Sequence, residues 1–147
     1  MLEAQQLERE FLAVGIFQAS KDVVGQAARE VLEGKGRGGY RFSEQSFERS
    51  RLYQGSPSRS GLALDRVAIF RPACAPGVSA LVSSLEDGWM TLHHVLARRL
   101  GVPVMLLRST APEDPWLVHS FRVWTPGGHE RVVQLLDDGG HLVFYQK

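Results

Sequence analysis

Hydrophobic and polar positions in the first part of the chain follow a pattern that indicates a strand and then a helix. Residues 11–17 form an apolar, partly β-branched run whose length suits a buried strand better than a helix. Ser20 then stands where a helix N-cap is expected, with Asp22 favourably placed in the first turn. Apolar residues follow at helical spacing over 23–32, and Gly34 supplies the stop. The pattern therefore predicts a strand, a cap and an amphipathic helix.

The next segment carries the weakest pattern. Residues 34–39 are mostly glycine and residues 54–61 are rich in Gly, Ser and Pro, so both are predicted to be loops. Residues 40–53, which lie between them, have room for one edge strand. Two short apolar runs follow at 67–70 and 78–82, on either side of a turn that is bracketed by prolines. Both runs predict extended structure.

A second amphipathic helix is predicted after Asp87, which is a candidate N-cap. Apolar residues between 89 and 100 fall on one face, Gly101 ends the helix, and 104–107 reads as the next strand. A shift of 68 places overlays the apolar positions of the first helix on those of the second. A duplicated strand–helix–strands unit would explain this overlay, although any two amphipathic helices share the same spacing.

The C-terminal part reads as an antiparallel meander of three strands. Residues 116–124 form the first strand, 129–136 the second and 141–145 the third. The turns between them, at 125–128 and 137–140, both contain a Gly-Gly pair. Turn chemistry and strand spacing agree here, so the meander is the best-defined part of the predicted fold.

These elements predict an α+β fold in a single globular domain that spans residues 1–147. Two amphipathic helices pack on a mainly antiparallel, twisted sheet of about six to eight strands. The pattern leaves open which sheet face the helices cover, because a register error of one residue exchanges the two faces.

Charge and cysteine content exclude several function classes. The 17 basic and 16 acidic side chains give a net charge of +1, whereas a nucleic-acid or membrane-surface binder usually has a lopsided charge. Cys74 is the only cysteine, so no intramolecular disulfide can form, and its proline-bracketed turn gives no sign of an activated thiol. The N-terminus is polar and lacks the features of a signal peptide, and no apolar run is long enough to span a bilayer. We therefore expect a cytoplasmic protein with neither a nucleic-acid nor a membrane partner.

The histidines are the main candidates for chemistry. His93 and His94 are adjacent on the second helix, so they point about 100° apart and cannot share one ion. His119, His129 and His141 lie one per meander strand, where neighbouring strands could gather them into a metal or catalytic site. Ordinary half-buried or surface histidines are the favoured interpretation. We therefore predict no catalytic residue, no metal and no cofactor, and keep a small hydrolase or transferase that uses these histidines as an alternative.

Acidic pairs and tryptophans are the candidates for partner binding. Glu113-Asp114 and Asp137-Asp138 fall at predicted turns, where solvated carboxylates are available to a basic partner. Trp116 and Trp124 lie on one face of a strand. That face either packs under the helices or, if it is open, makes an interface anchor, through which a homodimer could also form.

Part of the sequence resembles a known family. The segments that carry the resemblance are 87–92, 96–101, 130–133, 137–138 and 143–145. Together they look like small bacterial immunity proteins, which are cytoplasmic antitoxins encoded beside effectors of type VI secretion or related contact-dependent systems. The resemblance implies a non-enzymatic protein that binds one cognate toxin and occludes its active site.

The expected function is therefore that of an immunity protein with a protein toxin as its partner. The residues predicted to contact the toxin are Glu113, Asp114, Trp116, Asp137 and Asp138. A self-associating adaptor or structural module remains an alternative, as does the small enzyme described above.

Overall fold

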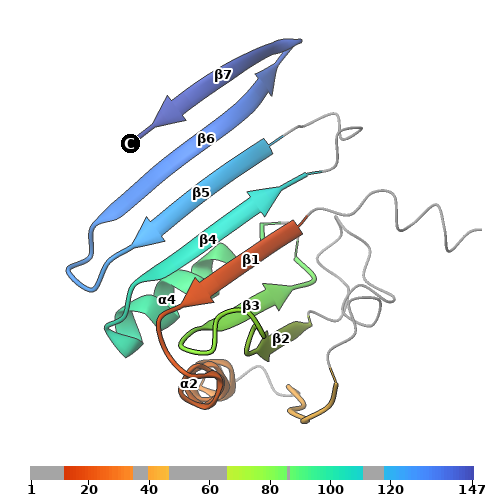
Figure 1. Ribbon diagram of the computed structural model, residues 1–147, viewed down its shortest axis with the longest axis vertical. Helices are drawn as coiled ribbons and strands as arrows, with labels where there is room; N and C mark the ends of the chain where they lie inside the picture. The colour runs from red at the N-terminus through yellow and green to blue at the C-terminus, as the bar shows by residue number, and fades with distance from the viewer. Residues whose placement is uncertain (1–11, 35–39, 47–65, 86, 111–117) are drawn as a thin grey trace, which may run out of the picture.

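The computed structural model describes residues 12–34, 40–46, 66–85, 87–110 and 118–147. In these ranges two helices pack on a seven-stranded antiparallel sheet, which confirms the predicted α+β class (Figure 1). In chain order the elements are β1 (Leu12–Phe17), α2 (Lys21–Glu33), β2 (Val67–Phe70), β3 (Ser79–Ser83), α4 (Met90–Leu100), β4 (Val104–Ser109), β5 (Val118–Trp124), β6 (Glu130–Asp138) and β7 (His141–Gln146). No helix in the described part of the chain is long and apolar enough to cross a membrane.

The strand order is β2-β3-β1-β4-β5-β6-β7, and every pair of neighbours is antiparallel. The first six elements, β1-α2-β2-β3-α4-β4, give the order β2-β3-β1-β4. This is the split β-α-β, or ferredoxin-like, topology, in which each β-α-β unit receives a strand of the other between its own two strands. The meander β5-β6-β7 then extends the sheet from the edge at β4 (Figure 1).

The two halves of this core repeat the same topology. A shift of 68 places carries α2 onto residues 89–101, which span α4, and carries β1 onto residues 80–85, which overlap β3. The shift therefore matches the first strand and the helix of each unit, whereas it carries β2 onto residues 135–138 of β6 and not onto β4, so the duplication stays a prediction.

The helix ends follow the predicted signals with one exception. Ser20 caps α2, with its Oγ accepting a hydrogen bond from Val23 N, and Gly34 and Gly101 end the two helices. Asp87, however, is not the N-cap of α4: the helix begins at Met90, and the Asp87 carboxylate instead accepts a hydrogen bond from Trp89 N at 2.8 Å. The reason is the left-handed backbone of residues 88 and 89, with φ of 69° and 58°, which separates Asp87 from the first helical turn.

Both helices lie on one side of the sheet. Phe17, Leu81 and Val104 point from β1, β3 and β4 into one cluster with the buried faces of α2 and α4, including Val24 and Leu96. The side chains of these strands that face the helices are almost fully buried, except for that of Arg108, which is half-buried. This arrangement decides the question that the sequence left open, because it assigns each strand residue to the helix side or to the opposite side.

The meander is confirmed over the described residues, while residues 116 and 117 of its first predicted strand lie outside them. The Thr125–Gly128 turn forms as expected, closed by a hydrogen bond from Gly128 N to Thr125 O. The second turn is tighter than predicted: β6 continues to Asp138, and only Gly139 and Gly140, with φ of 63° and 89°, connect the strands. Two residues with positive φ are what a two-residue hairpin turn requires. No strand forms in residues 40–46, and the rest of the candidate edge strand at 40–53 lies outside the described residues.

Candidate functional site

The sheet face opposite the helices carries exposed apolar side chains, and no described element covers it on β1 or on β4 to β7 (Figure 1). We call this surface the open face. Its apolar residues are Leu12, Val14, Ile16, Met105, Leu107, Phe121, Val123, Val133, Leu135, Leu142 and Phe144. Leu107 is 46% exposed and Phe144 is 65% exposed, so large apolar groups meet solvent here.

Strand register arranges the open face in rows that run across the sheet. One row contains directly opposed residues of five strands, in the order Leu12, Ser109, His119, Leu135 and Phe144. The next row contains Val14, Leu107, Phe121, Val133 and Gln146. Opposed residues of antiparallel strands point to the same side, so these rows form a continuous surface.

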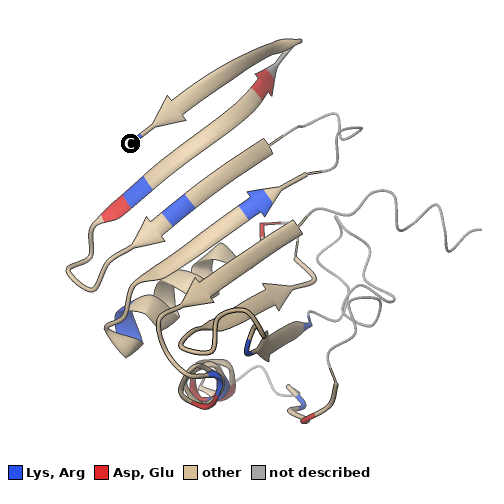
Figure 2. Cartoon of the chain, in the orientation of Figure 1, with Lys and Arg blue, Asp and Glu red and all other residues tan. Residues whose placement is uncertain are grey.

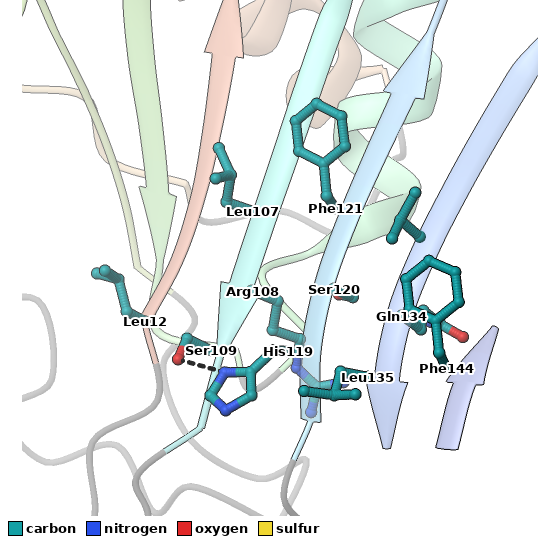
Figure 3. Close-up of a pocket in the computed structure, with 11 residues that line it drawn as sticks. Leu12, Leu107, Arg108, Ser109, His119, Ser120, Phe121, Gln134, Leu135 and Phe144 are labelled. Carbon is teal, nitrogen blue, oxygen red and sulfur yellow. Dashed lines mark hydrogen bonds between the residues drawn. The ribbon is translucent and has the colours of Figure 1, made fainter. Parts of the chain in front are cut away.

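A shallow groove of about 400 Å³ lies along these two rows. Leu12, Leu107, Phe121, Leu135 and Phe144 supply most of its apolar wall (Figure 3). The groove is open to solvent along its length, so it fits an apolar surface of a partner better than an enclosed small molecule.

The polar feature of the groove is a pair formed by Ser109 and His119. The Ser109 Oγ lies 2.9 Å from the His119 Nδ1, at the ends of β4 and β5 where the two residues are directly opposed (Figure 3). Both side chains are accessible. Among the described residues, no Asp or Glu makes a hydrogen bond with this histidine.

The meander histidines are not brought together. His141 belongs to the opposite sheet side from His119, and His129 lies at the β5–β6 turn, where its carbonyl accepts a hydrogen bond from Thr125 N. No group of three or more His, Cys, Asp or Glu residues in the described ranges could hold a metal ion. The structure therefore gives no support to a shared metal site of the three histidines.

The helix histidines serve packing. His93 is fully buried, stacks on Phe17 at 5.6 Å between ring centroids, and has Nδ1 at 3.1 Å from Trp89 O. Burial lowers the pKa of His93 below its usual value, and this outweighs the opposing effects of the Trp89 and Leu81 backbones and of Asp87. The Nε2 atom makes no hydrogen bond of ordinary geometry. His94 meets Trp124 edge to face at 5.8 Å, and Trp124 is buried in the core.

The structure describes some of the residues that are predicted to contact a partner, and others lie outside it. Glu113, Asp114 and Trp116 lie outside the described residues. Asp137 is exposed, and its Oδ1 accepts a hydrogen bond from Gly140 N at 2.7 Å, so this carboxylate helps to close the β6–β7 hairpin. The backbone of Asp138 ends β6 opposite His141. Cys74 is exposed, as expected for a turn residue.

Charged residues are sparse on β1, β4, β5 and β7, whereas β6 has four, namely Glu130, Arg131, Asp137 and Asp138. β1 and β7 contain no Asp, Glu, Lys or Arg, and β4 and β5 contain one arginine each (Figure 2). The arginine of β5, Arg122, lies on the helix side and pairs with Glu130 at 2.6 Å. On the open face itself, Arg131 and Asp137 stand at opposite ends of β6.

Sequence reasoning did not identify the open face, although β4 and β7 carried a signal for it. Residues 104–107 and 142–145 are apolar at consecutive positions, and a strand with this composition is typically covered on both sides. The structure covers β4 on one side, and β7 is exposed throughout.

The fold and this surface define an α+β protein with a large apolar sheet face that no described element covers on β1 or on β4 to β7. Comparison with family models, with curated proteins and with solved structures finds no match.

Proposed function

We propose that this protein is an immunity protein that binds a cognate interbacterial toxin, and that the open face is the surface that binds it. The resemblance described above suggests the class of partner. The observation that carries the proposal is the set of exposed apolar side chains on the open face of a sheet whose other side packs against helices at β1, β3 and β4. Contiguous apolar surface of this kind marks interaction sites in proteins that are otherwise stable in water.

The chemistry of the open face favours a protein partner. Leu107, Phe121 and Phe144 offer apolar and aromatic groups that can anchor an interface, and the Ser109–His119 pair and Arg131 supply polar groups at the groove and at its margin. A nucleic acid would require a basic surface, and the strands of this face supply few cations. A rigid sheet lying across the active site of a toxin would neutralise it by occlusion.

The proposal is tested by expressing the tagged protein with its neighbouring genes and identifying the proteins that copurify. We expect one neighbour-encoded toxin at about equal stoichiometry, together with inhibition of that toxin. The Leu107→Asp variant places a charge at the centre of the open face and should weaken binding by about 30-fold or more.

Val23→Asp is the matched control. Val23 is 50% exposed on α2, close to the 46% of Leu107, and it belongs to the helix layer rather than to the open face. This variant should bind the toxin as the unmodified protein does. Equal loss of binding in both variants would contradict an interface on the open face, and failure to recover any toxin would contradict the immunity function.

A second candidate function, a small hydrolase, rests on the Ser109–His119 hydrogen bond. Serine activated by a neighbouring histidine is a common nucleophile, and the groove beside the pair would accept an apolar acyl group. The test is hydrolysis of short-chain fatty acid esters by the purified protein. Esterase activity that is lost in Ser109→Ala but remains measurable in Leu107→Asp would favour the enzyme. Residual activity unchanged by Ser109→Ala would eliminate this candidate.

A further inference from the structure

β7 is an edge strand of the sheet that the described residues form. In the described part of the chain β7 pairs only with β6. Lys147 and Val132 each donate a backbone hydrogen bond to the other. This pair determines which residues of β7 direct their N–H and C=O groups toward β6 and which direct them away from it. Residues that bond inward to β6 are His141, Val143 and Tyr145. Residues whose N–H and C=O groups therefore point outward are Leu142, Phe144 and Gln146.

This edge lacks the features that usually prevent strand pairing between molecules. The six residues of β7 include no Lys, Arg, Asp, Glu or Pro, and the β6–β7 register runs without a bulge. All six side chains are exposed, with Leu142 and Phe144 on the open face and Val143 and Tyr145 on the other. An uncharged, regular edge strand that is apolar on both sides is a template for another strand.

We propose that β7 pairs antiparallel with β7 of a second copy of this chain, about a two-fold axis that passes midway between the two copies of Phe144. An axis perpendicular to the sheet keeps the open faces of both copies on the same side. Residues whose N–H and C=O groups point outward must then lie opposite one another across the interface. Leu142 of one copy lies opposite Gln146 of the other, and the two copies of Phe144 lie opposite each other. In this register every outward-pointing N–H and C=O of β7 finds a partner.

Side-chain complementarity selects a second copy as the occupant. The register places the two Phe144 rings opposite each other on the open face, and it places Val143 opposite Tyr145 on the other side. Aromatic pairs and aromatic–β-branched pairs are favourable cross-strand neighbours. Lys147 falls opposite His141, so no lysine meets its own copy. An isologous contact needs a patch that is complementary to itself, and this uncharged strand satisfies that condition.

The dimer would join two seven-stranded sheets into one and would make the two open faces continuous. The proposal does not depend on the toxin-binding function, because backbone groups at the edge of β7 form the pairing. Phe144 also lines the groove, but Leu107, which tests the toxin interface, lies on β4 inside the sheet. The two proposals can therefore fail separately.

Disulfide trapping tests the register in a Cys74→Ser background. Phe144→Cys places two thiols directly opposite each other, and oxidation should convert most of the protein to a covalent dimer. Leu142→Cys is the matched control, since residue 142 is 64% exposed and residue 144 is 65% exposed, on the same face. In the proposed register the two copies of residue 142 stand about 14 Å apart, beyond the reach of a disulfide. Crosslinking of both variants to the same extent, or of neither, would overturn the register.

Blocking the backbone tests the strand pairing itself. Gln146→Pro removes an outward N–H and leaves the bonds to β6 in place, and proline is tolerated at such an edge position. Sedimentation equilibrium should show dimerisation weakened by about tenfold or more, because two intermolecular hydrogen bonds are lost by symmetry. Gln146→Ala keeps the N–H and should dimerise as the unmodified chain does, as should Leu107→Asp.

A chain that remains monomeric over the whole concentration series overturns the proposal. Loss of the dimer in Leu107→Asp with retention in Gln146→Pro also overturns it, because the interface would then lie on the open face. Circular dichroism on each variant shows that the fold is intact, and toxin binding by Gln146→Pro reports on the proposed function independently of dimerisation.

Discussion

At the scale of single residues, Gly15 leaves the space that the His93 ring occupies. A Cβ atom built on Gly15 would lie 1.8 Å from His93 Nε2 and 2.0 Å from Cδ2. The imidazole therefore lies directly on the backbone of β1, in space that any other residue at position 15 would fill. This contact explains both a glycine in the middle of a central strand and a fully buried histidine on α4.

Gly15→Ala should destabilise the protein by about 1–3 kcal/mol, because the buried ring must move to admit the methyl group. Urea unfolding followed by circular dichroism measures the change. Gly25→Ala is the control: position 25 lies inside α2 with nothing within 4 Å of its added Cβ, so alanine should stabilise by about 0.5–1 kcal/mol. Combining Gly15→Ala with His93→Ala should recover part of the loss, and strict additivity would contradict a direct contact.

Burial of His93 makes stability depend on pH. Its pKa is lowered from the usual 6.5 in the folded state, so the unfolded chain binds a proton at a higher pH than the folded chain does. The free energy of unfolding should therefore fall as the pH decreases below about 6.5, until folded His93 itself becomes protonated. Urea unfolding between pH 8 and pH 5 measures this slope.

His93→Leu supplies the comparison for the pH dependence. This variant cannot titrate at position 93, so its stability should change less over the same pH range. The carboxylate of Glu30 is held by Gln26 and Arg99, which lower its pKa from 4.5, so its contribution to the pH dependence falls below this range. An unchanged slope in His93→Leu would assign the pH dependence to other groups.

At the scale of elements, local signals explain where the helices end. Ser20 has extended backbone and its Oγ accepts from Val23 N at 3.3 Å, which satisfies one of the free N–H groups of the first turn. Gly101 adopts the left-handed conformation at the end of α4, with φ of 62°. α4 begins differently, because its preceding residues 88 and 89 are left-handed.

Ser20→Ala should lower the free energy of unfolding by about 1 kcal/mol, since the cap acceptor is removed. Ser20→Asp keeps an acceptor beside the positive end of the helix dipole and should leave the stability close to its original value. Thermal unfolding of the three proteins measures both changes. A Ser20→Asp variant as unstable as Ser20→Ala would show that the hydroxyl acts by some other contact.

At the scale of the whole molecule, the helices support only part of the sheet. α2 packs on β2 and β3 and α4 packs on β4, so the core cluster extends no further along the sheet than Trp124 of β5. β6 contributes Val132 as a buried residue near one end, and β7 is exposed along its length. The meander therefore depends on hydrogen bonding and on its own apolar faces.

Native-state hydrogen exchange in dilute protein should show that β7 is less stable than the strands that pack against the helices. The inward-bonded amides of Val143 and Tyr145 should open at a lower free-energy cost than the amides of β1 and β3, because few buried contacts hold β7. The outward amides of Leu142, Phe144 and Gln146 should exchange fastest and should gain protection as the concentration rises, if β7 pairs with its copy. Uniform protection across the sheet would mean that the meander belongs to the same cooperative unit as the core.

The candidate site was only partly accessible to sequence reasoning. Three of the predicted contact residues, Glu113, Asp114 and Trp116, lie outside the described residues, and Asp137 bonds to a hairpin turn. Acidic pairs at predicted turns are local features that the sequence shows directly. The open face is not a local feature, since it consists of alternate residues from strands far apart in the chain.

By itself the sequence determined what depends on neighbours along the chain. The strands, the two helices, the Ser20 cap, the glycine stops and the hairpin turns all follow from periodicity and backbone preference, which act over a few residues. Only the tertiary structure decided the strand order, the face that the helices cover, the Gly15–His93 contact and the Ser109–His119 pair. These depend on register, and in a strand a shift of one residue exchanges the buried and exposed faces while changing nothing in the local pattern.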